Sequence, residues 1–299
     1  MTAPATPAAS VVIPVYNAAA HLPRCLEGLR HQATDGLPGP IELVFVDDAS
    51  TDGSGTLLEE ADHPGLRILR NPERRGIPFS RNRGWRAAAA PIVFFTDADC
   101  WNPPDWIAQG LRVFREAPGL RGLYGPIFYD VRPKDRRLAD RIVENRNGRP
   151  PYITANVAYQ RQALEEVGGL DESLRFGGSD QDLGYRVARH GPVDFAPSVV
   201  VYHQRRLWDR QSLSLYAERI PNYLDLIRKF PQVESMGRFR LQALAQLATM
   251  VLVVPALAIS LAQVRARDDL RLVPLFYWYK WVRHVHIWRW AWRNKTFLL

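Results

Sequence analysis

The chain is poor in cysteine, and no apolar run opens it. Only two of its 299 residues are cysteines, Cys25 and Cys100, and nothing in their spacing is typical of a metal site. We therefore expect no disulfide, and a reducing compartment. The first ten residues, MTAPATPAAS, lack the positive cluster and apolar stretch of a secretory signal. These absences place the protein, as an expectation, on the cytoplasmic side.

Most of the chain also lacks an excess of either charge. The formal net charge is +8, but residues 232–299 alone hold ten Lys/Arg against three Asp/Glu, a net +7. The same segment contains five of the nine tryptophans. A basic, tryptophan-rich segment favours a membrane surface over nucleic acid. We therefore expect a membrane surface as a partner and no nucleic acid.

Strand-like and helix-like segments alternate through the first hundred residues. Short β-branched and aromatic runs predict strands, and apolar residues at helical spacing predict helices between them. The strands are expected at 10–16, 41–46, 66–69 and 92–96, and the helices at 18–32, 53–61 and 79–90. This order predicts an α/β fold with a Rossmann-like, mostly parallel sheet covered by helices on both faces.

The rhythm is looser after residue 105. We expect helices at 106–115, 162–167 and 213–230 and from Ser179 onward, and strands at 122–131, 153–159, 193–195 and 198–202. The length allows one large domain with an appendage, or two modest domains. We predict a loose tail at 1–9, a main domain at 10–231 and a helical, membrane-associated region at 232–299.

Polar or acidic residues follow three of the predicted strands. In an open parallel sheet the ligand binds beyond the carboxyl ends of the strands, so these residues should share one edge. Carboxylates gathered there would repel one another without a cation, and Mg²⁺ or Mn²⁺ prefers carboxylates together with phosphate oxygens. The pattern indicates a metal-bridged diphosphate, while a strand end followed by a helix cap is the structural alternative. The residues are Tyr16, Asn17, Asp47, Asp48, Asp97 and Asp99.

Six ordered motifs resemble those of glycosyltransferase family 2. They are VIPVYN at 12–17, VDDASTDGS at 46–54, RGIPFSRNRGW at 75–85, FFTDADC at 94–100, GGLDESL at 168–174 and GSDQDLGYRV at 178–187. Over roughly residues 10–204 the chain is similar to the inverting enzymes of this family, which have the GT-A fold. The resemblance implies transfer of a single sugar from a nucleotide-sugar donor, most commonly a UDP-sugar, to an acceptor hydroxyl.

The resemblance also implies roles for individual side chains. Tyr16 would stack on the nucleotide base, Asp48 would hydrogen-bond it, and Asp97 would contact the ribose. Asp99 would coordinate Mn²⁺ or Mg²⁺, with His203 joining the metal or the diphosphate. Two further donor-binding positions are implied, Pro14 and Arg81. The structural alternatives are a solvated helix face for Arg81 and a purely structural histidine at position 203.

The catalytic base of the family lies in a Glu-Asp pair at the start of a helix. Here that pair is Ser179 and Asp180, so the aspartate is present and the preceding glutamate is not. Asp180 is therefore expected to take the proton of the acceptor hydroxyl. Asp182 competes for this role, although on a helix it points about 200° away from Asp180. The missing glutamate affects the expected acceptor contacts more than the chemistry.

A second signature separates single transfer from processive synthesis. Gln204, Arg205, Arg206 and Trp208 resemble the Gln-x-x-Arg-Trp signature of processive synthases, but Leu207 stands where that signature has arginine. A processive synthase is therefore disfavoured. Arg205 or Arg206 could still neutralise the leaving diphosphate.

The C-terminal region contains two membrane-related patterns. Residues 241–264 include no charged side chain and are long enough to cross a bilayer, although glutamines and Pro255 weaken the pattern. The alternative is a buried or surface-lying helix pair broken at Pro255. Further on, Trp281, Val285, Trp288 and Trp292 recur at helical spacing beside His286, Arg289 and Arg293. That pattern favours an amphipathic helix in the headgroup region over an aromatic core.

From this region we expect a peripheral or single-pass C-terminal anchor, and a lipid-linked or cell-envelope glycan as the acceptor. Two other classes of function compete. One is a non-catalytic module that binds nucleic acid or anionic lipid through the basic tail. The other is a glycoside hydrolase with paired carboxylates, which has no use for base-binding residues such as Tyr16 and Asp48.

Overall fold

The chain divides into two compact units. The computed structural model describes residues 6–132, 135–141, 144–149, 151–175, 177–230, 264 and 267–294. The first unit comprises residues 1–130, 143–175 and 179–204, and the second comprises residues 131–142, 176–178 and 205–299. The boundary expected at residue 231 stays a prediction.

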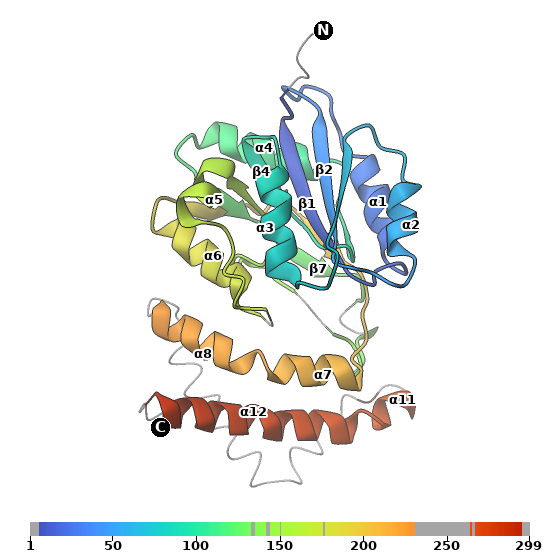
Figure 1. Ribbon diagram of the computed structural model, residues 1–299, viewed down its shortest axis with the longest axis vertical. Helices are drawn as coiled ribbons and strands as arrows, with labels where there is room; N and C mark the ends of the chain where they lie inside the picture. The colour runs from blue at the N-terminus through green and yellow to red at the C-terminus, as the bar shows by residue number, and fades with distance from the viewer. Residues whose placement is uncertain are drawn as a thin grey trace. The chain divides into compact units, whose positions relative to one another are not determined.

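A seven-stranded sheet in the order β3-β2-β1-β4-β8-β6-β9 forms the centre of the first unit (Figure 1). Strands β3, β2, β1 and β4 run parallel, as do β6 and β9, while β8 is antiparallel to both of its neighbours. The mostly parallel sheet expected from the sequence is therefore confirmed. The strands are β1 (Ala9–Val15), β2 (Ile41–Asp47), β3 (Leu66–Arg70), β4 (Ile92–Phe95), β6 (Gly122–Tyr124), β8 (Val157–Gln160) and β9 (Val193–Phe195).

Helices cover both faces of this sheet, because alternate residues of each strand point to opposite sides. In β1, Ile13 belongs to one core cluster and Val12 to the other. The Ile13 cluster includes residues of α1 (Leu22–Arg30), α2 (Ser54–Glu59) and α4 (Trp106–Glu116). The Val12 cluster includes residues of α3 (Ile77–Ala87), α5 (Arg161–Val167) and α6 (Ser179–Ala188). Figure 1 shows α3 crossing in front of the central strands.

A second, three-stranded sheet lies in the same unit, in the order β5-β10-β7. Its strands are β5 (Cys100–Trp101), β10 (Val201–His203) and β7 (Ile127–Tyr129). The single strand expected over 122–131 is therefore wrong, because this segment forms β6 in the large sheet and β7 in the small one. The break falls at Gly125 and Pro126. A β-carbon at position 125 would lie 1.8 Å from the carbonyl oxygen of Val199, and Pro126 has no N–H for a ladder.

Four helices are described in the second unit: α7 (Arg210–Ala217), α8 (Ile220–Lys229), α11 (Arg267–Leu270) and α12 (Val273–Arg293). The single helix expected over 213–230 is wrong, since α7 and α8 are separate. Pro221 lies in the first turn of α8, where its missing N–H costs no helical hydrogen bond. Inside one continuous helix the same proline would remove a hydrogen bond. The helix expected in the C-terminal aromatic stretch is confirmed by α12, which packs against α7 and α8.

The predicted membrane span is not part of the described chain. Residues 241–263 lie outside the described ranges, and Val264 belongs to no helix or strand. Across the ranges that are described, every helix is either too short or too polar to cross a bilayer.

Candidate active site

The carboxyl ends of β1, β2 and β4 meet at one edge of the large sheet. Val15 lies opposite Asp47 in the parallel pair of β1 and β2, and Val12 lies opposite Phe95 in the pair of β1 and β4. Tyr16, Asp48 and Asp97 follow these strand ends and therefore share the edge where open α/β sheets bind ligands.

Pro14 fits its place near the end of β1. The Val12 carbonyl accepts a hydrogen bond from the amide of Thr96 at 3.4 Å, so Val12 faces β4. Pro14, two residues on, faces the same way, beyond the last paired residue of β4, Phe95. Its missing N–H therefore costs no ladder hydrogen bond.

Hydrogen bonds join the loops that follow β1 and β2. The backbone amide of Asn17 donates to Ser50 Oγ at 3.1 Å, and the amide of Thr51 donates to Asn17 Oδ1 at 2.8 Å. Asn17 and Ala49 have positive φ angles of 47° and 61°, a conformation that costs free energy in non-glycine residues. The strained residues and the reciprocal bonds hold this edge of the sheet in one arrangement.

Asp52 adds a carboxylate to the same junction. Its Oδ2 accepts from the amide of Ala19 at 2.9 Å, and its Oδ1 accepts from the amide of Ser54 at 3.1 Å and from the Ser54 hydroxyl. Burial alone would raise the pKa of Asp52, but the hydrogen bonds from Ser54 and Ala19 outweigh it and hold that pKa below its usual value.

Asp48 fixes the loop before α3. Its side chain is buried and accepts from Asn71 Nδ2 at 2.6 Å and from the amides of Arg75 and Gly76, both at 2.8 Å. Arg175 also donates to the carbonyl oxygen of Arg75, at 2.9 Å. The Asp48 carboxylate thus positions the residues that lead into α3, in addition to any contact with a ligand.

Tyr16 presents an exposed ring beside this loop. Tyr16 is 38% exposed, and the guanidinium carbon of Arg74 lies 4.1 Å from the centroid of its ring, in a cation–π contact. Arg74 was not among the site residues predicted from the sequence. Its position next to the motif at 75–85 was the only signal, and its contact with Tyr16 depends on a fold that brings residues 16 and 74 together.

Arg81 and Asp97 form an ion pair inside the site. The Arg81 side chain is 6% exposed, so a solvated helix face is the wrong description of this residue. Its Nε is buried and has no hydrogen-bond partner within the described part of the chain. Arg81 therefore balances the charge of Asp97 and holds that carboxylate at the sheet edge.

A tight turn brings Asp99 to His203. The amide of Cys100 donates to the Asp97 carbonyl at 3.0 Å, and Cys100 then pairs with His203 across β5 and β10. His203 Nε2 lies 3.3 Å from Asp99 Oδ2, and both side chains are buried. His203 Nδ1 lies 2.9 Å from the Gln204 carbonyl oxygen, which can only accept, so Nδ1 carries the proton. His203 Nε2 therefore faces the Asp99 carboxylate, an arrangement that a proton on Nε2 or a cation between the two side chains would stabilise.

The donor atoms here fit a divalent cation. Ligand atoms of Asp99, Cys100 and His203 all lie within 4.8 Å of one another. Asp99 and His203 were expected from the sequence, but Cys100 was not, because only the pairing of β5 with β10 brings it to His203. Burial, together with the charges of Asp99 and Asp97, raises the pKa of the Cys100 thiol well above its usual value.

The first turn of α6 contains both candidate bases. Asp182 is 1% exposed and pairs with Arg186 at 2.7 Å, and Arg186 also donates to the carbonyl oxygens of Val167 and Gly169. Asp182 is thus a structural residue. Asp180 is partly exposed, and its Oδ1 accepts from the amide of Gln181 at 3.0 Å.

The residues after β10 have structural partners within their own units. In the first unit, Gln204 Nε2 donates to the His21 carbonyl at 3.1 Å. In the second unit, Arg205 pairs with the buried Asp140 at 2.9 Å.

The fold and this edge define the class of protein: a glycosyltransferase with the GT-A fold. A solved structure with this fold is the mannosyltransferase PcManGT from Pyrobaculum calidifontis in complex with GDP-Man and Mn²⁺. It has a TM-score of 0.62 and 20% sequence identity, covering 93% of this chain and 86% of that one.

The family profile described as glycosyl transferase family 2 matches residues 10–168. This match spans more than half of the chain, and the chain belongs to that family.

Two curated relatives are similar in sequence. Glycosyltransferase AglE of Haloferax volcanii is 26% identical over 216 residues, which are 67% of this chain and 68% of that protein. The undecaprenyl-phosphate 4-deoxy-4-formamido-L-arabinose transferase of Serratia proteamaculans is 30% identical over 180 residues, 56% of this chain and 53% of that protein. The chain matches only part of two further relatives, 30% of the length of one and 57% of the length of the other.

Proposed function

We propose that this glycosyltransferase moves one sugar, with inversion at the anomeric carbon, from a nucleotide-sugar donor to an acceptor hydroxyl in a metal-dependent reaction. The observation that carries this proposal is the sheet edge where ligand atoms of Asp99, Cys100 and His203 lie within 4.8 Å of one another. The Pyrobaculum structure contains GDP-Man and Mn²⁺, which supports a nucleotide-sugar donor and a divalent metal. A UDP-sugar is the proposed donor, since UDP is the commonest choice in the family.

The donor nucleotide would lie along the carboxyl ends of β1, β2 and β4. Tyr16 would stack on the base with its exposed ring, next to Pro14 and Arg74. Asp48 would accept a hydrogen bond from the base, in addition to the three bonds that hold the loop before α3. Asp97, oriented by Arg81, would accept from the ribose hydroxyls.

Asp99 and His203 would hold Mn²⁺ or Mg²⁺ between them. A divalent ion bound there supplies positive charge to the diphosphate as it leaves. Asp180 would accept the proton of the acceptor hydroxyl while its oxygen forms the new bond to the anomeric carbon. The bond from that carbon to the diphosphate breaks on the opposite face, which inverts the configuration.

A thermal-shift screen tests the donor. UDP-, GDP-, dTDP- and CMP-sugars are each added with Mn²⁺ and, in parallel, with a chelator. Binding to the native state raises the free energy of unfolding by about 2.7 kcal/mol when the ligand is at 100 times its Kd. We expect stabilisation by the UDP-sugar with Mn²⁺ and its loss with chelator. No stabilisation by any donor would contradict the proposed function, and stabilisation by GDP-sugars alone would contradict the choice of base.

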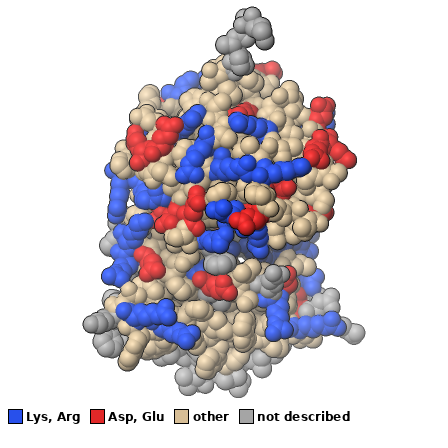
Figure 2. Space-filling view, in the orientation of Figure 1, with Lys and Arg blue, Asp and Glu red and all other residues tan. Residues whose placement is uncertain are grey.

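The acceptor is proposed to be a lipid-linked or other cell-envelope glycan, reached from the cytoplasmic side of a membrane. The Serratia relative is by its description an undecaprenyl-phosphate sugar transferase, which supports a lipid-linked acceptor. On the face of the first unit seen in Figure 2, acidic and basic side chains are intermixed.

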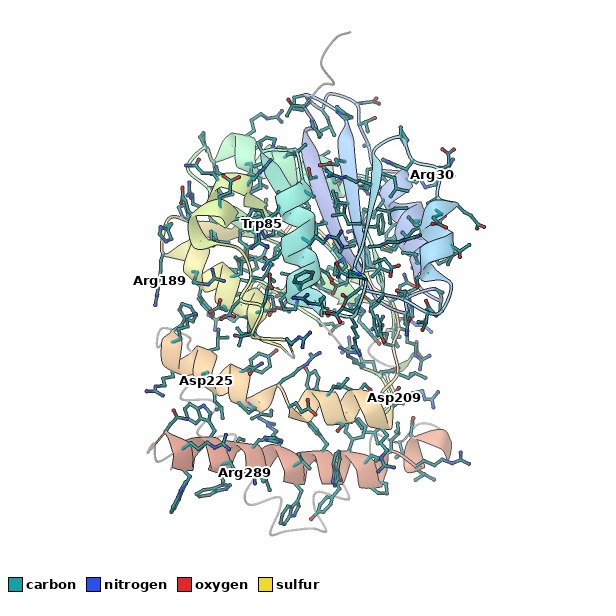
Figure 3. The ribbon with its side chains drawn as sticks, in the orientation of Figure 1. Arg30, Trp85, Arg189, Asp209, Asp225 and Arg289 are labelled. Atoms are coloured by element: carbon teal, nitrogen blue, oxygen red, sulfur yellow. The ribbon has the colours of Figure 1, made fainter. Side chains whose placement is uncertain are left out.

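Helix α12 would bring the chain to the lipid surface. Five exposed apolar side chains, four of them tryptophans, recur every three or four residues along one side of this helix. They are Trp278, Trp281, Val285, Trp288 and Trp292, between 38% and 88% exposed. Ring side chains project from the side of α12 opposite α7 and α8 (Figure 3). Since these residues are exposed, the alternative of an aromatic core stripe does not describe them.

The polar features of α12 fit anionic lipid. The helix has no acidic residue, and its two exposed arginines, Arg289 and Arg293, lie next to the tryptophan stripe. On the inner side, Trp290 Nε1 donates to Asp225 of α8 at 2.7 Å, which fixes the rotation of the helix. Tryptophan and arginine together are typical of helices that lie in the headgroup region.

Flotation with vesicles tests this contact. The full chain should float with phosphatidylglycerol-containing vesicles, and Trp281→Ser/Trp288→Ser/Trp292→Ser should reduce the bound fraction at least tenfold. Leu207→Ser, which removes an exposed apolar side chain elsewhere in the second unit, is the matched control. Undiminished flotation of the triple variant would exclude the α12 stripe as the membrane contact, as would flotation that does not depend on anionic lipid.

A further inference from the structure

The cation site includes a sulfur atom. Cys100 lies directly after Asp99 and opposite His203 in the β5–β10 pair, and the three donor atoms lie within 4.8 Å of one another. Metal–ligand distances in protein zinc sites are about 2.0–2.3 Å, so two ligands of one tetrahedral ion lie roughly 3.3–3.8 Å apart. The three donor atoms would therefore have to approach one another by up to about 1 Å to share one ion.

The number and type of these donors are informative. Catalytic sites for zinc-like ions use three protein ligands and leave a further position for water or substrate. Asp99, Cys100 and His203 supply one oxygen, one sulfur and one nitrogen. The remaining position would suit a diphosphate oxygen of the donor. Mg²⁺ prefers oxygen ligands, whereas thiolate and imidazole favour Zn²⁺ and Co²⁺.

We propose that Cys100 is a third protein ligand of the catalytic ion, and that the site therefore selects borderline, thiophilic divalent ions over Mg²⁺. The inference deepens the proposed function at the same site, and only its consequence for turnover rests on that function. Binding requires the thiol to lose its proton to solvent as the sulfur–metal bond forms, so one proton is released for each ion bound. Cys100 would then also set which ion assists departure of the diphosphate.

The second cysteine provides a matched control. Cys25 is equally buried, and its thiol donates to the Asp97 carbonyl at 3.7 Å. It is not a member of the three-residue cluster. Cys25→Ala and Cys100→Ala remove the same atom from two buried positions close to the same acidic residues. A difference between them reports on the metal rather than on the loss of a buried thiol.

Cobalt titration of the full chain tests the proposal without turnover. Co²⁺ is the probe, because a thiolate bound to cobalt gives an intense near-ultraviolet charge-transfer band that oxygen and nitrogen ligands lack. We expect this band in the wild-type chain and in Cys25→Ala, whose only cysteine is Cys100, and its loss in Cys100→Ala. Loss of an outer-shell partner of a metal ligand typically costs 10–100-fold in affinity. Loss of Cys100 should therefore weaken Co²⁺ binding by at least about 100-fold and leave Mg²⁺ affinity within about threefold.

Calorimetry in buffers of different ionisation enthalpy supplies a second measurement, the number of protons released. It should be one higher in the wild-type chain than in Cys100→Ala. Stoichiometric Co²⁺ binding without the band overturns the proposal, as does absence of Co²⁺ binding. A band that disappears in Cys25→Ala also overturns it, and this holds even if Cys100→Ala fails to fold. A chain that gives the band but binds no nucleotide sugar would refute the proposed function and leave the metal ligand standing.

Discussion

Asp180 and Asp182 lie two residues apart on α6, and we expect opposite consequences from the same substitution at each. Asp180→Asn should abolish the function of a base and leave the fold intact. Asp182→Asn should weaken the fold and leave the chemistry intact. The contrast follows from their surroundings, since Asp182 is 1% exposed and paired with Arg186, whereas Asp180 is partly exposed.

The stability change can be estimated from the ion pair. Removing one partner of a buried pair typically costs about 3–5 kcal/mol. The Arg186 side chain is 19% exposed and keeps its bonds to the carbonyls of Val167 and Gly169, so part of that cost is avoided. We therefore expect about 2–3 kcal/mol for Asp182→Asn. At roughly 2–4 °C per kcal/mol for a domain of this size, Tm should fall by about 5–10 °C.

The catalytic change is estimated from general-base catalysis. Loss of such a group lowers turnover by about 10²–10⁴-fold, or roughly 2.7–5.4 kcal/mol in the activation barrier. Asp180→Asn preserves shape at a partly exposed position, so its effect on stability should stay within about 0.5 kcal/mol. Its affinity for the nucleotide-sugar donor should be unchanged, because the acceptor proton is the only feature it is proposed to handle.

Two assays on purified variants test these expectations: thermal denaturation, and sugar transfer measured with saturating donor and Mn²⁺. The reasoning is refuted if Asp180→Asn retains more than about a tenth of the wild-type turnover. It is also refuted if Asp182→Asn is inactive at a temperature where it is folded with an unchanged Tm. Equal loss of donor affinity and turnover in Asp180→Asn would assign this residue to donor binding instead.

Three further outcomes follow from the donor side of the site. Tyr16→Ala should weaken UDP binding by about 5–150-fold by calorimetry, since aromatic stacking on a base contributes about 1–3 kcal/mol, while Tyr16→Phe should bind normally. Arg81→Met should weaken donor binding by about tenfold, because it removes the cation paired with Asp97. Arg86 is exposed on the same helix, so Arg86→Met should leave donor binding unchanged. Equal effects of the two substitutions would exclude the ion pair as the cause. The pKa of Asp52 is lower in the folded state than in the unfolded state, so its stabilising contribution is present above the unfolded pKa and is lost as pH falls through the folded pKa. Acid denaturation curves of Asp52→Asn should show a smaller loss of stability over that acidic range, and an unchanged slope would contradict the role of its hydrogen bonds.

Local patterns were sufficient for most of the central fold. The alternation of strands and helices up to residue 96 could be read from short apolar runs, and β1, β2, β3 and β4 all lie where it placed them. The strand expected over 122–131 failed for a non-local reason. Gly125 is required by the Val199 carbonyl, whose approach cannot be seen in the sequence around residue 125.

The same distinction applies to the candidate site. The pairing of Asp182 with Arg186 joins residues four positions apart on a helix, so it could have been read from the sequence. The contact of Cys100 with His203 joins residues that are distant in the chain. It depends on β5 pairing with β10. A strand overlapping β10 was expected at 198–202, but the two-residue β5 leaves too weak a pattern to predict.

The two aspartates of the Asp-x-Asp motif differ in how the protein treats their charges. Asp97 is balanced by Arg81, a cation that belongs to the chain and is itself buried. Asp99 faces the Nε2 of His203, whose other nitrogen is committed to the Gln204 carbonyl. The ligand atoms of Asp99, Cys100 and His203 that lie together therefore put the candidate cation site at Asp99, while Arg81 offsets the charge of Asp97. Such charge compensation lowers the free-energy cost of placing two carboxylates after one buried strand.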